Sequence, residues 1–206
     1  VVEIPPSADG VGIFGTLMDA WQRPIDDVGA KGRDKGNGGK YVLVPEGYQG
    51  GLLPMSFTYR QRTNNGFAIL RAIIPDASQE NIDKAAEFAK RIKVYPLAQA
   101  ANPPENNYID IYGQVMEGTP VLDETIYAEL DEIIQEEVVE EQNLAMMGML
   151  NSIGIQKGKP FEPDAKTMEI YAAAAPEALQ YMVEQYHRHL NPLAYEGKKW
   201  SLLIPP

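Results

Sequence analysis

The chain has 206 residues, 44% of them hydrophobic, which is enough for a sizeable core in one large domain or two small ones. Its formal net charge of −11 repels phosphate backbones and anionic membrane surfaces, and no apolar run approaches the roughly 18 residues that a spanning helix needs, so we predict no nucleic acid partner and no membrane span. The absence of cysteine excludes disulfides, thiolate nucleophiles and cysteine-type zinc sites.

Residues 1–75 have the pattern of an antiparallel β region, because short apolar runs alternate with glycine and proline. We expect these runs to form an antiparallel β-sheet or sandwich. Asn64-Asn65-Gly66 lies between the last two runs, and an Asn-Gly pair in such a place predicts a hairpin. The four runs are Val11–Met18, Lys40–Val44, Met55–Arg60 and Phe67–Ile74.

After Pro75 the periodicity becomes helical, so residues 76–206 are predicted to be mainly helical. Ser78 is a plausible N-cap for a helix that runs to about Lys93. The alternation of residues 108–115 predicts one short strand in this region. Pro176 should kink or divide the last helix. The other predicted elements are a helix capped by Asp123, a helix from about Leu144 that stops at Gly154, a helix from about Ala165 to His189, and a strand over Trp200–Ile204.

Each predicted helix has apolar residues at helical spacing that share one face. Exposed Met, Leu and Tyr stripes would suit an oligomer or interdomain contact. These faces comprise Ile82, Ala85, Ala86, Ala89 and Ile92 in the first helix, Ile126, Leu130, Ile133 and Ile134 in the second, Leu144, Met147 and Leu150 in the third, and Leu179, Met182, Val183, Tyr186 and Leu190 in the last. The predicted class is therefore α+β, with the N-terminal sheet packed against a C-terminal cluster of three to four helices in one compact unit. Both ends resemble interrupted β structure, which suggests a fragment of a longer two-domain protein.

Acidic residues dominate the middle of the chain, since no lysine or arginine occurs between Lys93 and Lys157. The segment from Asp123 to Glu141 alone contains nine carboxylates. The simplest interpretation is a solvated helix face. A contact face for a basic partner or a neighbouring subunit is a second interpretation. Calcium binding is a third, although the spacing of an EF-hand loop is absent.

A glycine-dense basic loop, GAKGRDKGNGGK, is the first candidate site. Its amides and the cations of Lys31, Arg33 and Lys35 could hold an anion. It is not a P-loop, because Tyr41 follows Lys40 and the loop leads into a strand. A wide structural turn and a ligand contact both remain open interpretations.

Asp19 and Trp21, just before this loop, are the second candidate, either as a binding platform or as a turn-capping carboxylate beside a core aromatic ring. We add Tyr41 and Arg71 as further candidate ligand-binding residues. His187 and His189 are the only histidines, and residues two apart on a helix do not share a face. No serine lies in a G-x-S-x-G context, and we identify no catalytic residue. We also predict no metal and no cofactor.

Three segments of the chain, in order, carry a family resemblance: DAWQRPIDDVGAKGRDKGNGGKYVLVPEGYQG, RIKVYPLAQAANPP and MMGMLNSIGIQKGKPFEPDA. They resemble the bacterial family "domain of unknown function 1254". The resemblance implies export to the periplasm or cell surface and a second, β-rich domain downstream, "domain of unknown function 1214". The family brings no established activity, so no catalytic residue is transferred. The chain departs from the family pattern at Glu46, Val138 and Asn143.

The leading functional hypothesis is a non-enzymatic binding or assembly module of an exported two-domain protein. Its expected partners are its own C-terminal β-rich domain, further copies of itself in a homo-oligomer, and a small anionic or glycan ligand. The alternative is a hydrolase or lyase with a polar, anion-binding pocket at the glycine-rich loop. The sequence names no substrate for either.

Overall fold

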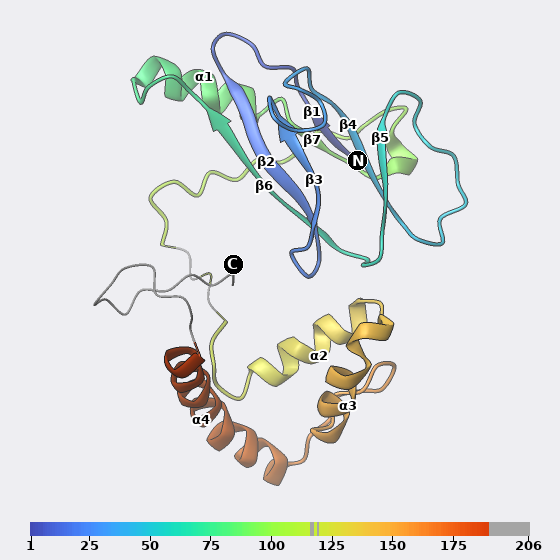
Figure 1. Ribbon diagram of the computed structural model, residues 1–206, viewed down its shortest axis with the longest axis vertical. Coiled ribbons are helices and arrows are strands. Elements are labelled where there is room, and N and C mark those ends of the chain that lie inside the picture. The colour runs from blue at the N-terminus through green and yellow to red at the C-terminus, as the bar shows by residue number, and fades with distance from the viewer. Residues whose placement is uncertain (116–117, 119, 190–206) are drawn as a thin grey trace. The chain divides into compact units, whose positions relative to one another are not determined.

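The computed structural model describes residues 1–115, 118 and 120–189. The chain divides into two compact units, Val1–Gln114 and Val115–Pro206, and each is described here by itself (Figure 1). The first unit contains strands β1 to β7 and helix α1, and the second contains helices α2 to α4. The predicted α+β class is confirmed. The β-rich unit extends to Gln114, beyond the boundary predicted at residue 75, because α1 and β7 belong to it.

Two sheets make up the first unit. The larger has the strand order β5-β4-β1-β7, and the smaller has the order β3-β2-β6. The strands of the larger sheet are β1 (Val2–Ile4), β4 (Gly39–Pro45), β5 (Phe57–Gln61) and β7 (Lys93–Val94). Those of the smaller sheet are β2 (Gly12–Asp19), β3 (Pro24–Gly29) and β6 (Gly66–Ile73).

The prediction of a wholly antiparallel sheet is wrong for one pair of strands. β4 and β5 are parallel, with Tyr41 opposite Phe57 and Pro45 opposite Gln61. Parallel neighbours need a long connection that returns the chain to its starting end, and residues 46–56 provide it. The other pairs of both sheets are antiparallel.

The predicted hairpin at Asn64-Asn65-Gly66 is also wrong, because β5 and β6 belong to different sheets. The segment between them is a corner held by Thr63, which is fully buried. The Thr63 hydroxyl accepts a hydrogen bond from the Ala20 amide (3.1 Å) and donates one to the Asn65 carbonyl (2.8 Å). The chain bends at residues 62–64, and Gly66 is already the first residue of β6. Long-range pairing therefore determines the partners of the two strands.

The core of the first unit takes residues from both sheets and from α1. β2 alternates strictly, so that Ile13 and Leu17 point inward, and Tyr41 and Phe88 complete the centre of the cluster. Helix α1 (Gln79–Ala89) begins, as predicted, with Ser78 as its N-cap. Phe88 is the buried residue of this helix, and Ile82 of the predicted apolar face is 44% exposed.

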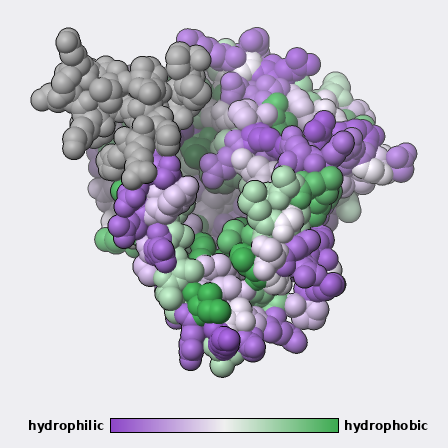
Figure 2. Space-filling model, turned by 60° about the horizontal axis from the view of Figure 1, so that its bottom comes forward, coloured by the Kyte–Doolittle hydropathy of each residue, from purple (hydrophilic) through white to green (hydrophobic). Residues whose placement is uncertain are grey.

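The second unit has a separate small core. Ile134, Met147 and Ile155 are buried at its centre, with Tyr127 and Leu130 packed against them. Apolar and hydrophilic side chains are interspersed over the surface of the helices (Figure 2). The helices are α2 (Ile126–Glu136), α3 (Leu144–Ser152) and α4 (Ala165–His189), and the described chain also has short 3-10 turns at Leu97–Gln99 and Glu141–Asn143.

Several helix predictions need correction. Residues 108–115 contain no strand, and a turn occupies Tyr112 and Gly113 instead. Pro176 lies inside α4 without dividing it. The predicted faces of α2 and α4 included exposed residues, namely Ile133, Leu179, Met182 and Val183, while Tyr171 and Ala175 are the buried residues of α4. Leu190, the strand Trp200–Ile204, and the side chains of Tyr186, His187 and His189 lie outside the described residues.

Two searches of the described residues gave negative results. No helix there has both the length and the apolar character needed to cross a bilayer. No cluster of three or more His, Cys, Asp or Glu side chains in the same residues is arranged to hold a metal ion.

Candidate functional site

One buried carboxylate organises the glycine-rich loop. Asp34 is 4% exposed; its Oδ1 accepts hydrogen bonds from the Gly29 amide (2.6 Å) and the Tyr41 hydroxyl (2.9 Å), and its Oδ2 accepts one from the Gly38 amide (3.0 Å). Three donors therefore replace the water that this charge loses on burial. Sequence analysis missed Asp34, although an aspartate between glycines is a typical signal of a side chain that folds back on its own turn.

Four further amides of the loop are also bonded within the first unit. They form backbone hydrogen bonds from Gly32 to Gly29 (2.8 Å), from Arg33 to Asp27 (2.9 Å), from Lys35 to Gly32 (3.3 Å) and from Asn37 to Asp34 (2.9 Å). An anion-binding nest needs amides that point outward without a partner. The geometry therefore favours the wide structural turn over the amide cradle.

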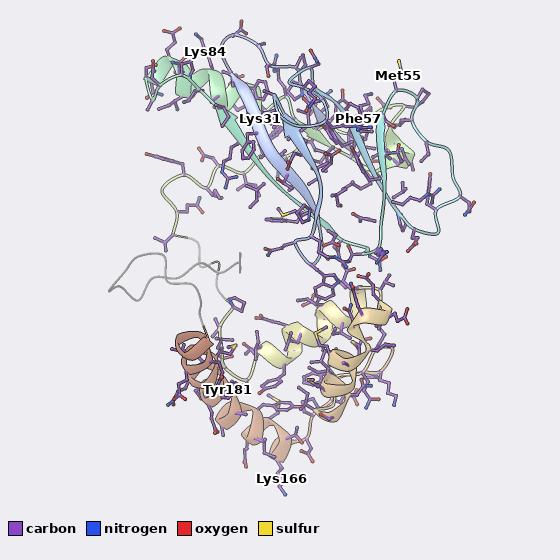
Figure 3. All side chains as sticks on the ribbon, in the orientation of Figure 1. Lys31, Met55, Phe57, Lys84, Lys166 and Tyr181 are labelled. Atoms are coloured by element: carbon purple, nitrogen blue, oxygen red, sulfur yellow. The ribbon has the colours of Figure 1, made fainter. Side chains whose placement is uncertain are left out.

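The seven candidate residues do not form one site. Lys31, Arg33 and Lys35 are exposed on the loop, and the Arg33 guanidinium lies 5.9 Å from the centroid of the Phe57 ring (Phe57 is labelled in Figure 3). Tyr41 is fully buried, and burial and its hydrogen bond to Asp34 raise its pKa well above the usual range. It is therefore a core residue.

Arg71 lies on the opposite, outer face of the smaller sheet. It is exposed on β6, where it pairs with Phe14 of β2. Phe14 is 49% exposed and points away from the core. Arg71 is thus set among exposed apolar side chains of that face.

Asp19 caps the turn between β2 and β3. Its Oδ1 accepts hydrogen bonds from the amides of Trp21 (2.9 Å) and Arg23 (3.0 Å), and its Oδ2 pairs with the Arg23 guanidinium at 2.6 Å. This is the turn-capping role that the sequence left open. The Trp21 indole Nε1 is buried with no hydrogen-bond partner among the described residues.

Asp19 and Arg23 also belong to a groove of about 460 Å³ between β3 and β5, which we call the β3–β5 groove. Tyr59, Arg60, Gln61 and Arg62 contribute to its walls. Arg60 lies in β5 and Arg62 follows the end of that strand, and both contribute to the lining of the groove. Sequence analysis missed this set, but the tripeptide Arg60-Gln61-Arg62 stands out in so acidic a chain.

The groove contains an arginine held by backbone carbonyls and a buried amide oxygen without a hydrogen-bond donor among the described residues. The Arg60 guanidinium donates to the backbone carbonyls of Glu46 and Tyr48, each at 2.9 Å, and these bonds fix its position without cancelling its charge. Gln61 is 9% exposed, and its Oε1 is buried with no donor among the described residues. A buried acceptor of this kind calls for a water or ligand donor.

The comparisons with known proteins give a family match in the first unit. Residues 1–96 match the family described as "Protein of unknown function (DUF1254)". The resemblance seen in the sequence is therefore confirmed for this DUF1254 region, whose match includes the glycine-rich loop and the β3–β5 groove. No curated protein matches the chain.

Among solved structures, the chain is similar to the VPA0106 protein from Vibrio parahaemolyticus, with a TM-score of 0.62 and 14% sequence identity. The match covers 92% of this chain and 46% of that protein, so the chain spans about half of its length. At this identity the likeness shows the fold alone.

We predict that Asp34→Ala lowers the free energy of unfolding by about 4 kcal/mol or more, because hydrogen bonds to a charged acceptor contribute roughly 1.5–3 kcal/mol each. Urea denaturation followed by circular dichroism measures the change. Lys31→Ala, on the same loop but exposed, is the control and should stay within about 0.5 kcal/mol of the parent chain. Equal stability of the two variants would show that Asp34 does not hold the loop.

We also predict a loss of stability at alkaline pH. Burial, and then the hydrogen bond that the Tyr59 hydroxyl donates to Asp26, raise the pKa of Tyr59 from 10.0 to about 12. The folded state therefore favours the neutral phenol, and this contribution is complete below pH 10 and is lost as the pH rises through 12. Tyr59→Phe should reduce the fall in unfolding free energy across this range. Tyr112→Phe, at a side chain 96% exposed, should leave the fall unchanged; identical profiles for both variants would contradict the prediction.

Proposed function

We propose that the chain is a non-enzymatic binding and assembly module of an exported two-domain protein, and that the β3–β5 groove binds an anionic ligand. The observation that carries the proposal is the convergence of Arg23, Arg60 and Arg62 on one groove in a chain with a net charge of −11. Arginines on one wall create a local positive potential that the acidic remainder of the chain does not supply.

The chemistry of the groove selects the ligand class. A guanidinium donates parallel hydrogen bonds to the two oxygens of a carboxylate, sulfate or phosphate group. The Tyr59 ring and the partly buried Ile25 add apolar surface to the walls. A small organic acid or an acidic sugar offers both an anionic group and an apolar face.

The alternative, a hydrolase or lyase built on the glycine-rich loop, has weaker support. An anion pocket there would use the loop amides, and hydrogen bonds within the loop and to Asp27 already engage those of Gly29, Gly32, Arg33, Lys35, Asn37 and Gly38. The side chains of Lys31, Arg33 and Lys35 remain exposed on the loop, so they are the matched comparison for the arginines of the groove.

The two-domain and export parts of the proposal rest on the family and on length. The VPA0106 protein is a fold neighbour of which the chain covers 46%, which leaves room for a second domain in proteins of this architecture. The DUF1254 resemblance implies that this second domain is β-rich and lies downstream, and that the protein is exported to the periplasm or cell surface.

The assembly part rests on the outer face of the smaller sheet. Phe67, Ile69 and Ile73 of β6 are 43%, 39% and 49% exposed, and their register places them on the same face as Phe14 of β2. Contiguous apolar surface on a sheet is typical of a protein–protein contact. We propose that a second copy of the chain covers this face.

We predict that inorganic sulfate and glucuronate bind to the chain, and that Arg60→Gln/Arg62→Gln weakens binding by at least about tenfold, since each charged hydrogen bond contributes about 1.5–3 kcal/mol. Isothermal titration calorimetry measures the affinity. Lys31→Gln/Lys35→Gln removes the same charge from the loop and should change the affinity less than twofold. Loss of binding in the loop variant alone would replace the groove with the loop site.

We predict a homo-oligomer in solution, and we predict that Ile69→Thr/Ile73→Thr shifts it toward the monomer, because threonine keeps strand propensity while removing apolar contact area. Size-exclusion chromatography with light scattering measures the mass. Val94→Thr, at a residue 58% exposed in the other sheet, is the control. A parent chain that is monomeric at every concentration would rule out the assembly role.

A further inference from the structure

A second cavity lies in the helical unit, in a part of the chain that the proposed function does not use. It has a volume of about 580 Å³ and lies between the end of α3, the loop over residues 160–164 and the first turns of α4. Its walls include Ile153, Phe161 and Ile170. A cavity of this size with apolar walls suits a small organic group.

Aromatic rings form the floor of this α3–α4 cavity. Tyr171 is 5% exposed and is stacked on Tyr127, with ring centroids 4.0 Å apart, and Phe161 lies nearly parallel to it at 6.1 Å. The Tyr171 hydroxyl donates to the Ile153 carbonyl, which fixes the ring. Stacked rings present electron-rich faces that attract cations.

All the charged side chains in the cavity walls are acidic. Glu162 and Asp164 are its ionisable carboxylates, and no lysine or arginine contributes to its lining. Hydrogen bonds from the Thr167 hydroxyl and amide lower the pKa of Asp164, so that it stays ionised. The carbonyl end of α3 adds negative partial charge, and Asp164 offsets the positive end of α4 as its capping residue.

The nearest lysines along the chain are Lys157, Lys159 and Lys166, and none of them is among the residues that line the cavity. Lys157 donates to the carbonyls of Gln135 and Glu137 at the end of α2. Lys166 projects outward from the start of α4 (Figure 3). Among the described residues, Glu162 and Asp164 are therefore the charged groups of the lining.

We propose that the α3–α4 cavity binds an organic cation, an alkylammonium or guanidinium group whose apolar part lies on the partly buried Phe161 ring and on Ile170 while its charge faces Glu162 and Asp164. Such a group comes either from a free amine or from a lysine or arginine side chain of a partner protein. The two sources share this chemistry and differ in what surrounds the cation.

The test titrates the whole chain with n-butylammonium, with N-acetyl-lysine methylamide and with n-pentanol, followed by NMR of the backbone amides and by calorimetry. Both cations should bind, with shifts at residues of the cavity, and neutral pentanol should bind at least about fivefold more weakly. Tighter binding of the lysine derivative would identify a protein partner as the source, and equal binding would identify a free amine. No binding of either cation, or equal binding of pentanol, would overturn the proposal.

Glu162→Gln/Asp164→Asn removes both charges while keeping side-chain size, and asparagine caps a helix as well as aspartate does. This variant should weaken cation binding by at least about fivefold, the effect expected for two partly exposed charge pairs. Glu169→Gln/Glu177→Gln removes two exposed carboxylates of α4 outside the cavity and should change the affinity less than twofold. Equal losses in the two variants would assign the attraction to net charge and overturn the site.

Discussion

The β-rich unit depends on the buried carboxylate of Asp34. Its partners are the last residue of β3 (Gly29), the residue before β4 (Gly38) and the hydroxyl of Tyr41 within β4. Because β3 belongs to the smaller sheet and β4 to the larger, one carboxylate links the two sheets at the place where the chain passes between them. Gly29 has a φ of +99°, and a Cβ there would lie 1.8 Å from the Ile13 carbonyl oxygen, so the close approach also requires a glycine. The position of the groove walls depends on this link, since β5 pairs directly with β4.

The positively charged side chains of the loop and of the groove differ in their surroundings. The loop lysines belong to a segment in which six backbone amides already donate hydrogen bonds within the first unit. Their side chains are exposed, so water and salt screen their charges. The groove arginines lie beside an ion pair, an aromatic ring and a buried amide oxygen without a donor. A ligand anion in the groove would meet several fixed groups at once, and fixed donors lose less entropy on binding than flexible side chains do.

Local signals in the sequence predicted local structure well. The Ser78 cap, the strand that ends at Pro45, and the stop at Gly154 each depend on neighbours within a few residues. Strand pairing depends on distant residues, so the Asn-Gly pair predicted a hairpin where the chain instead crosses between sheets at Thr63. Periodicity located apolar helix faces but not the buried residues, because Phe88 and Tyr171 are buried by partners far along the chain. The same limit hid Asp34 and the arginines of the groove, because their roles appear only when separate strands come together.

Acidic and basic side chains are distributed unevenly along the chain. Lysine and arginine are absent between Lys93 and Lys157, so the second unit begins with a run of carboxylates, whereas the arginines that line the groove belong to the first unit. A net charge of −11 therefore describes neither surface, because at a Debye length of about 8 Å a ligand senses mainly the charged groups close to it. An anion can be held by the first unit and a cation by the second although the whole chain is strongly acidic. Selectivity of this kind comes from the fold that gathers a few side chains, and total composition sets only how readily each ligand approaches.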